Sequence, residues 1–341
     1  MAKAVYDFDF ILYNAAASCE SRTVEAFHKP TKKKLIFSAR TDLWGDWRNK
    51  NGGWIAEQNE ELGKDFYHAD DFVVEDIQEP RPITIGRKVI DNQINKSNKK
   101  LAVSSYYGYS GKGESFRLEL SSIMKYKGQR ENMIRPLNID NLRDYLIDKH
   151  HCKLVSGIEA DDAFAMDLYA AHKKWLESKT DANKLIGVAI DKDAKQIEGF
   201  HYNPDKDNEV RYINGLGKLW LTGDGDVDGY GRKWLYFQIL SKDAADNYCA
   251  NSATDKRWGV KAAYKLLLPC TTDKECIQAL VNGYRVLYPE PFEFVGWRGD
   301  TLKLDWMKVL QENWNMAHML RFEGDRVDVA ALVQKLGINC D

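Results

Sequence analysis

The 341-residue chain lacks the features that mark membrane-spanning, secreted and disulfide-bonded proteins. No segment approaches the roughly 18 consecutive apolar residues of a membrane helix, and the N-terminus lacks the basic and then apolar pattern of a secretory signal. Cysteine is scarce, with six widely spaced residues and no CxxC pair, which argues against a disulfide framework and against a zinc site. We therefore expect a protein that resides in a reducing cytoplasm and does not bind a membrane.

A strong net charge is absent as well. The 49 Lys and Arg residues nearly balance the 51 Asp and Glu residues, for a formal net charge of −2, so the whole chain gives no sign of a polyanionic partner. One stretch differs, because eight basic residues between positions 96 and 130 outnumber two acidic ones, Glu114 and Glu119. The eight are Lys96, Lys99, Lys100, Lys112, Arg117, Lys125, Lys127 and Arg130. We interpret this stretch as a candidate track for the phosphates of a nucleic acid.

The chain is rich instead in clusters of acidic residues, each of which follows or interrupts an apolar run. The clusters, in chain order, are Asp7 with Asp9, Glu159 with Asp161 and Asp162, Asp191 with Asp193, and Asp243 with Asp246. Carboxylates that converge without a cation repel one another and partly protonate, so this pattern favours a metal site. Oxygen ligands prefer Mg²⁺ or Mn²⁺ to zinc, and paired ions of this kind serve phosphodiester chemistry.

Alternating strand and helix patterns predict that these acids lie at one edge of a sheet. The segment Ala4 to Tyr13 has the pattern of a buried strand, which would place Asp7 and Asp9 on the same face. Further strands are expected at residues 99–109, 152–155 and 185–190, and helices at 83–97, 138–150 and 162–177. The fold class is therefore α/β, with a mainly parallel central sheet flanked by helices and the acids at the carboxyl ends of its strands.

Two other regions differ in character from this core. Residues 29–82 carry many turn signals, such as the letters NGG at 51–53 and PRP at 80–82, and we interpret them as an insertion. The chain after residue 230 has a mostly helical pattern. We therefore expect two domains, an α/β core at 1–230 and a helical region at 231–341.

Five short motifs occur in an order that resembles the 5′-nuclease superfamily. They are DFD at 7–9, YKGQR at 126–130, IEADD at 158–162, IDKD at 190–193 and DAADN at 243–247. The resemblance covers roughly residues 1–20 and 83–270. It is to flap endonucleases, to the 5′ to 3′ exonuclease domains of bacterial DNA polymerases and, most closely, to bacteriophage 5′ exonucleases. YKGxR and ExDD in this order are its most specific parts.

The resemblance implies a PIN-like nuclease core that hydrolyses the phosphodiester bonds of DNA by a two-metal-ion mechanism, with Mg²⁺ or Mn²⁺ as cofactor. Such an enzyme of DNA replication would act as a 5′ to 3′ exonuclease on duplex ends and as an endonuclease on flaps, with an RNA–DNA hybrid as a further candidate substrate. Its metal ligands would be Asp7, Glu159, Asp161, Asp162, Asp191, Asp193, Asp243 and Asp246. We expect a monomer in the cytoplasm, which is the host cytoplasm for a bacteriophage protein.

The resemblance also implies which residues contact the substrate. In a helical gateway at residues 111–150, Lys127 and Arg130 would touch the scissile phosphate and Tyr126 would stack on a base. Because Lys127 and Arg130 are three positions apart, they could bracket one phosphate on chemical grounds as well. Together with the metal ligand Asp191, they are the predicted catalytic residues.

A helix-hairpin-like segment at residues 255–264 would grip duplex DNA after the last acid pair. The predicted substrate contacts outside the YKGQR motif are Arg117, Lys256, Arg257, Gly259 and Lys261. Only Gly259 remains of the two or three glycines that are usual in the family's hairpin, so a K⁺ site there is left open.

One departure from the family keeps another function open. The second strand ends in Tyr109-Ser110-Gly111, where the family has an acid. Either Ser110 or a water would replace one ligand, or Glu114 would substitute for it. Since fewer acids should weaken metal affinity, a homologue that binds nucleic acid without cutting it is one alternative.

A second alternative is a phosphatase similar to the haloacid dehalogenases, which also have DxD at the end of a first strand. Asp7 would then be the nucleophile and Asp9 the general acid, with the letters GDGDVDG at 223–229 as a late acidic motif. This function would leave YKGQR, EADD and DAADN without roles. GDGDVDG also resembles a calcium loop, but it lacks the expected Glu, so we predict a surface turn there.

Overall fold

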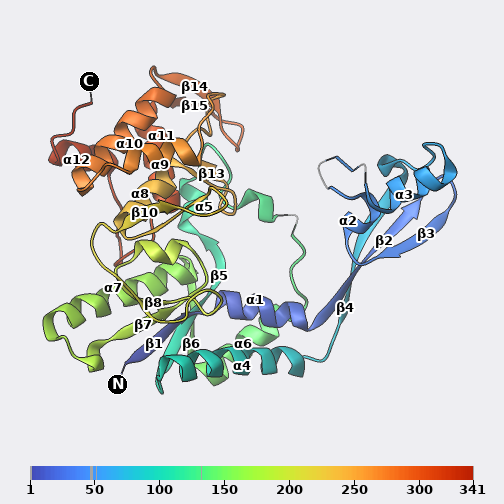
Figure 1. The fold of residues 1–341 in the computed structure, drawn as a ribbon, viewed down its shortest axis with the longest axis horizontal. Coiled ribbons are helices and arrows are strands. Elements are labelled where there is room, and N and C mark those ends of the chain that lie inside the picture. The colour runs from blue at the N-terminus through green and yellow to red at the C-terminus, as the bar shows by residue number, and fades with distance from the viewer. Residues whose placement is uncertain (1, 47–48, 51, 132, 341) are drawn as a thin grey trace. The chain divides into compact units, whose positions relative to one another are not determined.

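The computed structural model describes residues 2–46, 49–50, 52–131 and 133–340. The chain divides into two compact units. The first comprises residues 1–10, 93–134 and 145–341, and the second comprises residues 11–92 and 135–144. Figure 1 labels their helices and strands, coloured from blue at the N-terminus to red at the C-terminus.

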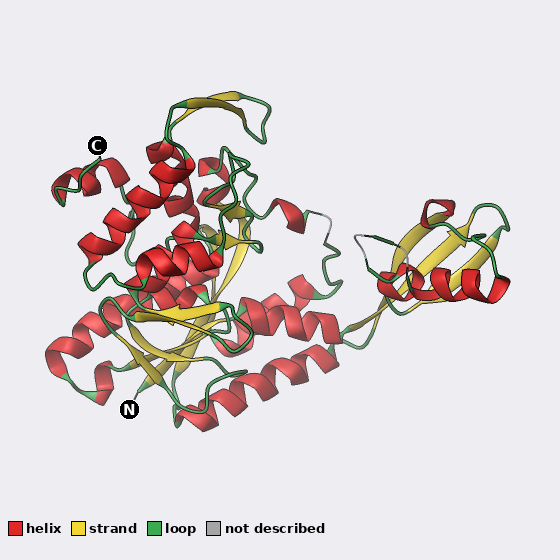
Figure 2. Ribbon diagram, turned by 45° about the horizontal axis from the view of Figure 1, so that its top comes forward, coloured by secondary structure: helices red, strands yellow, loops and turns green. Residues whose placement is uncertain are grey.

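A six-stranded sheet lies at the centre of the first unit, with helices packed around it (Figure 2). Its order is β6-β5-β1-β7-β8-β9. The strands are β1 (Lys3–Asp7), β5 (Tyr106–Ser115), β6 (Cys152–Gly157), β7 (Leu185–Val188), β8 (Gly199–Tyr202) and β9 (Arg211–Ile213). Neighbouring strands run parallel except for β8 and β9, which are antiparallel. The predicted α/β class with a mainly parallel central sheet is therefore confirmed.

Helix α7 (Ala160–Ser178) packs against this sheet and carries part of the acid cluster at its start. The Glu159 backbone N–H donates a hydrogen bond to the Asp162 carboxylate (3.3 Å), which closes the first turn. Phe164 packs in a buried cluster with residues of β1 and β7. Gly187 of β7 allows this close approach, because an added Cβ would lie 2.6 Å from the Phe164 ring. The packing therefore fixes the start of α7 relative to the strands.

Most of the other elements predicted for the core are present. Helices α4 (Thr84–Leu101) and α6 (Ile139–His150), together with α7, β6 and β7, lie where the sequence pattern placed them. The second strand differs, because residues 99–101 end α4 and β5 begins only at Tyr106. Two lysines in the last turn of α4 favour the helix there, since they interact with the negative end of its dipole.

The first strand is shorter than predicted. β1 ends at Asp7 and α1 (Asp9–Ser18) begins two residues later, so Asp7 and Asp9 do not share the face of one strand. The Asp7 carboxylate accepts a hydrogen bond from the Asp9 backbone N–H (3.0 Å) at the start of the helix. A continuous apolar run fits a strand and a buried helix equally well, which is why the pattern did not reveal the change.

Helices are the longest elements after residue 231, where the sequence pattern predicted a mostly helical region. Its helices are α8 (Arg232–Leu240), α9 (Val260–Leu267), α10 (Asp273–Leu287), α11 (Trp306–Ala317) and α12 (Val329–Lys335). Two-stranded hairpins in this region pair β12 (Lys242–Asp243) with β13 (Tyr248–Cys249), and β14 (Phe292–Val295) with β15 (Thr301–Leu304). A further hairpin, β10 (Lys218–Leu221) with β11 (Val227–Tyr230), comes just before α8. Nearly all of α8 is buried, and its apolar residues belong to the hydrophobic core of this region.

The second unit contains a separate antiparallel sheet. Its strands, in the order β3-β2-β4, are β2 (Glu20–His28), β3 (Lys33–Phe37) and β4 (Phe72–Pro80). Helices α2 (Arg40–Trp44) and α3 (Gly53–Leu62) share a small apolar core with this sheet. Of the turn signals that suggested an irregular insertion at 29–82, Gly53 begins α3 and Pro80 ends β4, whereas residue 51 lies outside the described residues.

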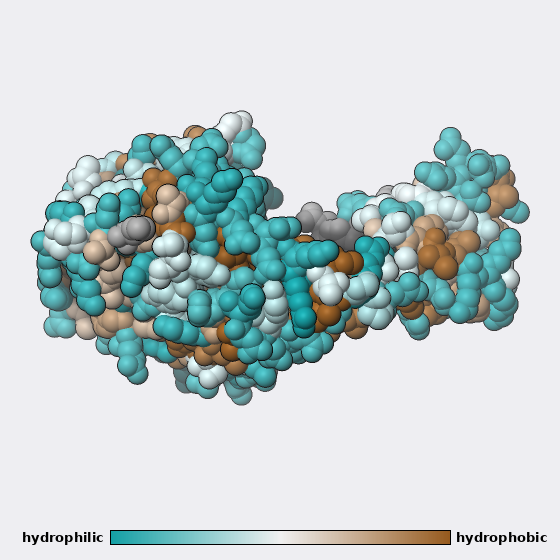
Figure 3. All heavy atoms as spheres, turned by 90° about the horizontal axis from the view of Figure 1, so that it is seen from below, coloured by the Kyte–Doolittle hydropathy of each residue, from teal (hydrophilic) through white to brown (hydrophobic). Residues whose placement is uncertain are grey.

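Within the described residues, a search for helices that could span a lipid bilayer finds none. The face drawn in Figure 3 is largely hydrophilic, and the apolar residues on it form small groups. The six cysteines are all free thiols.

Candidate active site

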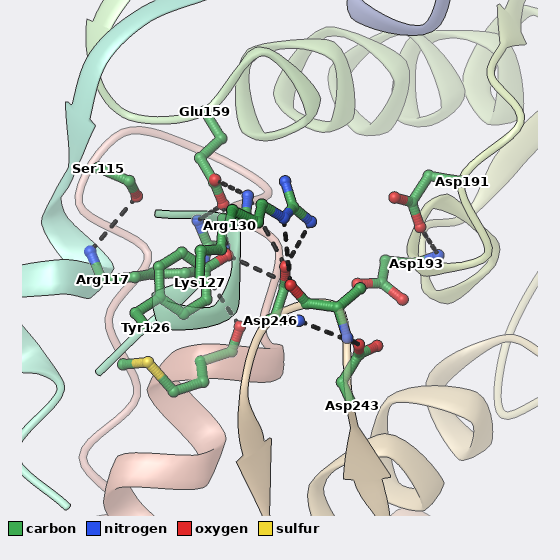
Figure 4. Close-up of polar contacts among 12 residues, drawn as sticks. Ser115, Arg117, Tyr126, Lys127, Arg130, Glu159, Asp191, Asp193, Asp243 and Asp246 are labelled. Carbon is green, nitrogen blue, oxygen red and sulfur yellow. Dashed lines mark hydrogen bonds and ion pairs between the residues drawn. The ribbon is translucent and has the colours of Figure 1, made fainter. Parts of the chain in front are cut away.

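The carboxyl ends of the parallel strands bring acids from distant parts of the sequence together in the first unit (Figure 4). Asp7 ends β1, Glu159 lies between β6 and α7, and Asp191 follows β7. Asp243 and Asp246 come from the hairpin of β12 and β13. Electrostatic interactions link Asp7 to Asp191, and link Asp246 to both Glu159 and Asp243. Asp193 connects the two sets, because it interacts with both Asp191 and Asp246. These acids therefore belong to one site, at the edge where open α/β sheets place their ligands.

Glu159 is surrounded by hydrogen-bond donors. Its Oε2 accepts from Tyr126 Oη (2.7 Å) and from Arg117 Nη1 (3.1 Å), and the Lys127 ammonium contacts its Oε1. Burial raises the pKa of Glu159, but Lys127 and Arg117 outweigh burial and hold the pKa below its usual range. Burial lowers the pKa of Lys127, but Glu159 and Asp246 outweigh it and raise the pKa to about 12. Both side chains are therefore ionised at neutral pH.

Asp162 and Arg117 form a buried ion pair at the start of α7. Arg117 Nη1 lies 2.6 Å from Asp162 Oδ2, and Nη2 lies 2.8 Å from Oδ1. Arg117 also donates to the backbone oxygens of Met316 and His318, and Asp162 accepts from the Leu320 N–H (3.0 Å). Arg117 is only 2% exposed and Asp162 is fully buried. This geometry ties α7 to the end of α11. The roles of Asp162 as a metal ligand and of Arg117 as a substrate contact stay predictions.

Asp161 has one buried oxygen, Oδ1, that lacks a hydrogen-bond partner among the described residues. Burial raises the pKa of Asp161 well above its usual range, and Glu159 and Asp162 raise it further. Ligand atoms of these three acids lie within 4.8 Å of one another. Since a buried carboxylate in such a place needs either a proton or a cation, this part of the site fits a metal ion.

A second group of acids, Asp191, Asp193 and Asp243, lies around the turn after β7. The Asp191 carboxylate accepts a hydrogen bond from the Asp193 N–H (2.8 Å), and Gln238 of α8 contacts the Asp193 carboxylate. Lys192 Nζ lies 2.7 Å from Asp243 Oδ2 and holds the pKa of Asp243 below its usual range, although burial alone would raise it. Burial, followed by the charge of Asp191, raises the pKa of Asp193. The sequence analysis did not identify Lys192 or Gln238 as site residues. The position of Lys192 inside the IDKD motif could have indicated it, whereas no motif covers Gln238 in α8.

Asp246 joins the YKGQR motif to the DAADN motif. Its Oδ2 accepts from Tyr126 Oη (3.1 Å), and its Oδ1 lies 3.2 Å from Arg130 Nη2 and 3.8 Å from Lys127 Nζ. Its backbone oxygen accepts from the Lys127 N–H (3.0 Å). Burial is the main cause that raises the pKa of Asp246. The YKGQR and DAADN motifs therefore form one polar network, although Arg130 and Asp246 are 116 positions apart in the sequence.

The residues of the YKGQR motif differ in exposure. Tyr126 is 6% exposed and its ring packs in the core of the C-terminal region, so the predicted stacking on a base is not what this structure shows. Its hydroxyl instead donates to Glu159 and Asp246. The side chains of Lys127 and Arg130 remain 25% and 47% exposed, which leaves them accessible to a phosphate.

Asp7 is buried beside Asp9 at the start of α1. Burial, followed by the charge of Asp9, raises the pKa of Asp7 to about 8. Asp9 accepts hydrogen bonds from Ser110 Oγ (2.7 Å) and from the Gly111 N–H (3.3 Å). Ser110 stands where the family has an acid, and an acid there would place another carboxylate against Asp9. Glu114, the predicted substitute, is exposed.

The residues predicted to grip duplex DNA lie at and just before the start of α9 (Val260–Leu267). Lys256, Arg257, Gly259 and Lys261 are all exposed. Lys256 Nζ donates to the backbone oxygen of Val286 (2.6 Å). These four residues are close in sequence and all accessible, and their contact with duplex DNA stays a prediction.

The GDGDVDG loop lies between β10 and β11 as a turn. The Asp224 carboxylate accepts from the Asp226 N–H (3.4 Å), and Asp226 Oδ1 accepts from the Val227 N–H (2.9 Å). Asp224 and Asp226 are exposed. The predicted surface turn is confirmed.

No protein-family model and no curated protein matches the chain. A solved structure of the T5 D15 protein co-crystallised with metal ions is similar, with 15% identity, a TM-score of 0.39, and coverage of 73% of this chain and 88% of that one. The bacteriophage T5 flap endonuclease in a complex with DNA and metal ions has a TM-score of 0.34, and the T5 5′-exonuclease with bound zinc has 0.35. Both are 15% identical to this chain and cover 67% of it and 90% of their own length.

Proposed function

We propose that this protein is a metal-dependent 5′ nuclease that hydrolyses the phosphodiester bonds of DNA. The observation that supports this function is the meeting of acids from separate chain segments beside Lys127 and Arg130 (Figure 4). Converging carboxylates hold divalent cations, and the two partly exposed basic side chains offer contacts to a phosphate. Phosphodiester hydrolysis of this type requires both kinds of group at one place.

Mg²⁺ or Mn²⁺ fits the site because its candidate ligands are carboxylate oxygens. One of them, the buried Asp161 Oδ1, has no hydrogen-bond partner within the part of the chain that the structure describes. The residues that would hold two ions are Asp7, Glu159, Asp161, Asp191, Asp193, Asp243 and Asp246. Asp162 would support them through its pairing with Arg117. When bound, the ions would activate a water for in-line attack and stabilise the departing oxygen.

Lys127 and Arg130 would bind the scissile phosphate. Both side chains face the acids through Glu159 and Asp246, and a phosphodiester can replace a carboxylate as their partner. The planar guanidinium of Arg130 can bind two phosphate oxygens at once. Positive charge at this place offsets the negative charge that develops on the phosphate in the transition state.

The proposed substrates are the 5′ ends of duplex DNA and 5′ flaps, with an RNA–DNA hybrid as a further candidate. The exposed residues at the start of α9 would contact duplex phosphates. They would belong to a DNA-binding domain at 231–341, in which Gly259 would be the candidate position for a K⁺ ion. A core at 1–230, with an insertion at 29–82 and a gateway at 111–150, would carry the chemistry. In this proposal the protein acts as a monomer in the cytoplasm, in DNA replication.

Digestion of labelled DNA tests the proposal. Duplex and flap substrates that carry a label at the 5′ or the 3′ end are incubated with Mg²⁺ or with EDTA. We expect short 5′-labelled products from both substrates with Mg²⁺ and none with EDTA. Binding of DNA without Mg²⁺-dependent cleavage would instead indicate the non-catalytic homologue. Hydrolysis of a small phosphomonoester with an acyl-phosphate trapped on Asp7 would indicate the phosphatase.

A further inference from the structure

A segment without long regular structure connects two parts of the acid site. It runs from Leu118 to Lys125, and we call it the strap. It follows Arg117, which is buried against Asp162, and it precedes the YKGQR motif at 126–130. The first residues of the strap end the short helix α5 (Phe116–Leu120). The backbone N–H and C=O groups of the rest of the strap need hydrogen-bond partners from other parts of the fold.

Glu312 of α11 supplies partners for the middle of the strap. Its Oε1 accepts hydrogen bonds from the Ser122 N–H (2.9 Å) and from the Ile123 N–H (2.8 Å). Its Oε2 contacts the Ser122 hydroxyl. The carboxylate therefore binds two successive backbone N–H groups and a side chain at once. α5 lies beside α11 in the fold, which places the strap within reach of this residue.

The loop between β14 and β15 supplies the donors that the strap oxygens need. Trp297 Nε1 donates to the Ser121 backbone oxygen (2.9 Å), and Arg298 Nη1 donates to the same oxygen (2.6 Å). Arg298 Nη2 donates to the Leu118 oxygen (2.8 Å). Gly296 permits this close contact, because an added Cβ would lie 2.3 Å from the backbone oxygen of Ser122.

Apolar packing fixes the end of the strap as well. Ile123 and Tyr126 are buried in the same hydrophobic core as Leu310 and Trp314 of α11. The hydroxyl of Tyr126 is the group that donates to the acids. The C-terminal elements therefore hold the strap from Leu118 up to the residue that precedes Lys127.

We propose that Glu312 is a positioning residue of the active site, assisted by Trp297 and Arg298. Through the strap, these residues hold Lys127 and Arg130 in register with the acids, and this role rests on the proposed nuclease function. The last part of the chain, for which the sequence indicated DNA binding, thus has a second task in building the site.

Two substitutions at Glu312 separate hydrogen-bond geometry from charge. In Glu312→Gln, the amide oxygen can still accept from Ser122 and Ile123 and the amide nitrogen can donate to the Ser122 hydroxyl. Glu312→Ala removes all three contacts. We expect Glu312→Ala to lower kcat for DNA cleavage at least about tenfold with KM changed less than twofold, and Glu312→Gln to retain wild-type kcat. Equal loss of kcat in both variants would overturn the proposal, because charge rather than positioning would then be responsible.

A readout that does not depend on activity keeps this test apart from that of the proposed function. Hydrogen–deuterium exchange of peptides covering 118–131 should be faster in Glu312→Ala than in wild type and unchanged in Glu312→Gln. Arg298→Ala, at an exposed position, should also speed exchange there. The matched control is Glu293→Gln on the exposed side of β14, which should leave both exchange and cleavage unchanged. Unaltered exchange in Glu312→Ala and Arg298→Ala would overturn the positioning role even if wild type cleaves DNA.

Discussion

The two groups of acids in the site are balanced by positive charge in different ways. Two basic side chains, Arg117 and Lys127, contact the group at the start of α7. Among the described residues, the group after β7 has one such contact, from Lys192. Arg117 is buried, whereas Lys192 is 49% exposed. The difference teaches that the fold itself supplies more positive charge to the first group than to the second, so in the proposed function the second group would rely more on a cation.

Removal of an acid from the second group should have the largest effect on activity. Asp191→Asn removes a carboxylate from the group that has less positive charge of its own. Because a bound metal contributes several kcal/mol to the transition state, we expect cleavage to fall roughly 10⁴-fold. The measurement is digestion of 5′-labelled duplex with Mg²⁺, with a gel-shift assay to show that DNA binding remains. Robust cleavage by this variant would remove the basis for the nuclease function.

Breaking the buried pair in the first group should affect stability most. Arg117→Met leaves the Asp162 carboxylate buried without its cation, so we expect a loss of about 3–5 kcal/mol in the free energy of unfolding. Urea unfolding followed by circular dichroism measures it. The control is Arg135→Met, which breaks an exposed pair with Asp140 and should cost less than about 1 kcal/mol. Equal losses in the two variants would show that the buried pair is not the support we describe.

Lys127 sharpens the comparison, because it contacts the first group but remains partly exposed. Lys127→Ala should lower cleavage about 10²-fold by removing one charged donor from the phosphate, and should also weaken DNA binding. Lys274→Ala is the matched control, since Lys274 is an exposed lysine of α10 and not a residue of the acid site. Single-turnover cleavage rates and binding curves for both variants test this expectation. An equal loss of activity in both variants would point to general charge rather than to this side chain.

The last effect concerns pH, and it appears only in the absence of metal. The pKa of Asp7 is raised to about 8 by burial and by Asp9, so the folded protein retains a proton that the unfolded chain releases near pH 4. Between about pH 4 and pH 8, Asp7 should therefore make the metal-free protein less stable as pH rises, by at most about 1.4 kcal/mol per pH unit. Thermal unfolding in EDTA across this range should show a shallower slope for Asp7→Asn. Identical slopes for the two proteins would contradict the shift.

Much of the candidate site could be foreseen from local signals. The order of the acidic motifs and their position after apolar runs predicted that Asp7, Glu159, Asp191 and Asp243 would meet, and the structure groups them. The alternation of strands and helices predicted the parallel sheet that brings them together. Both signals lie within short stretches of sequence, where periodicity and spacing are directly visible.

Other features of the site could not be foreseen. The change from β1 to α1 between Asp7 and Asp9 is hidden in one apolar run. The partners of Arg117 and Tyr126 lie on other elements, whereas the basic stretch suggested a phosphate contact for Arg117 and the family resemblance implied base stacking for Tyr126. The sequence did not predict a role for Glu312, because its partner in the strap, Ser122, lies 190 positions away in the chain.

The amino-acid sequence alone determined which side chains could carry metal and phosphate chemistry and which layered fold would present them. Those properties follow from residue type and from hydrophobic periods of two or 3.6 residues, which are local. Only the tertiary structure decided which acids keep free oxygens, which are bound by a buried cation, and which elements hold the basic residues in place. Such assignments depend on the packing of segments far apart in the chain, where burial and competing partners set the energy of every charge.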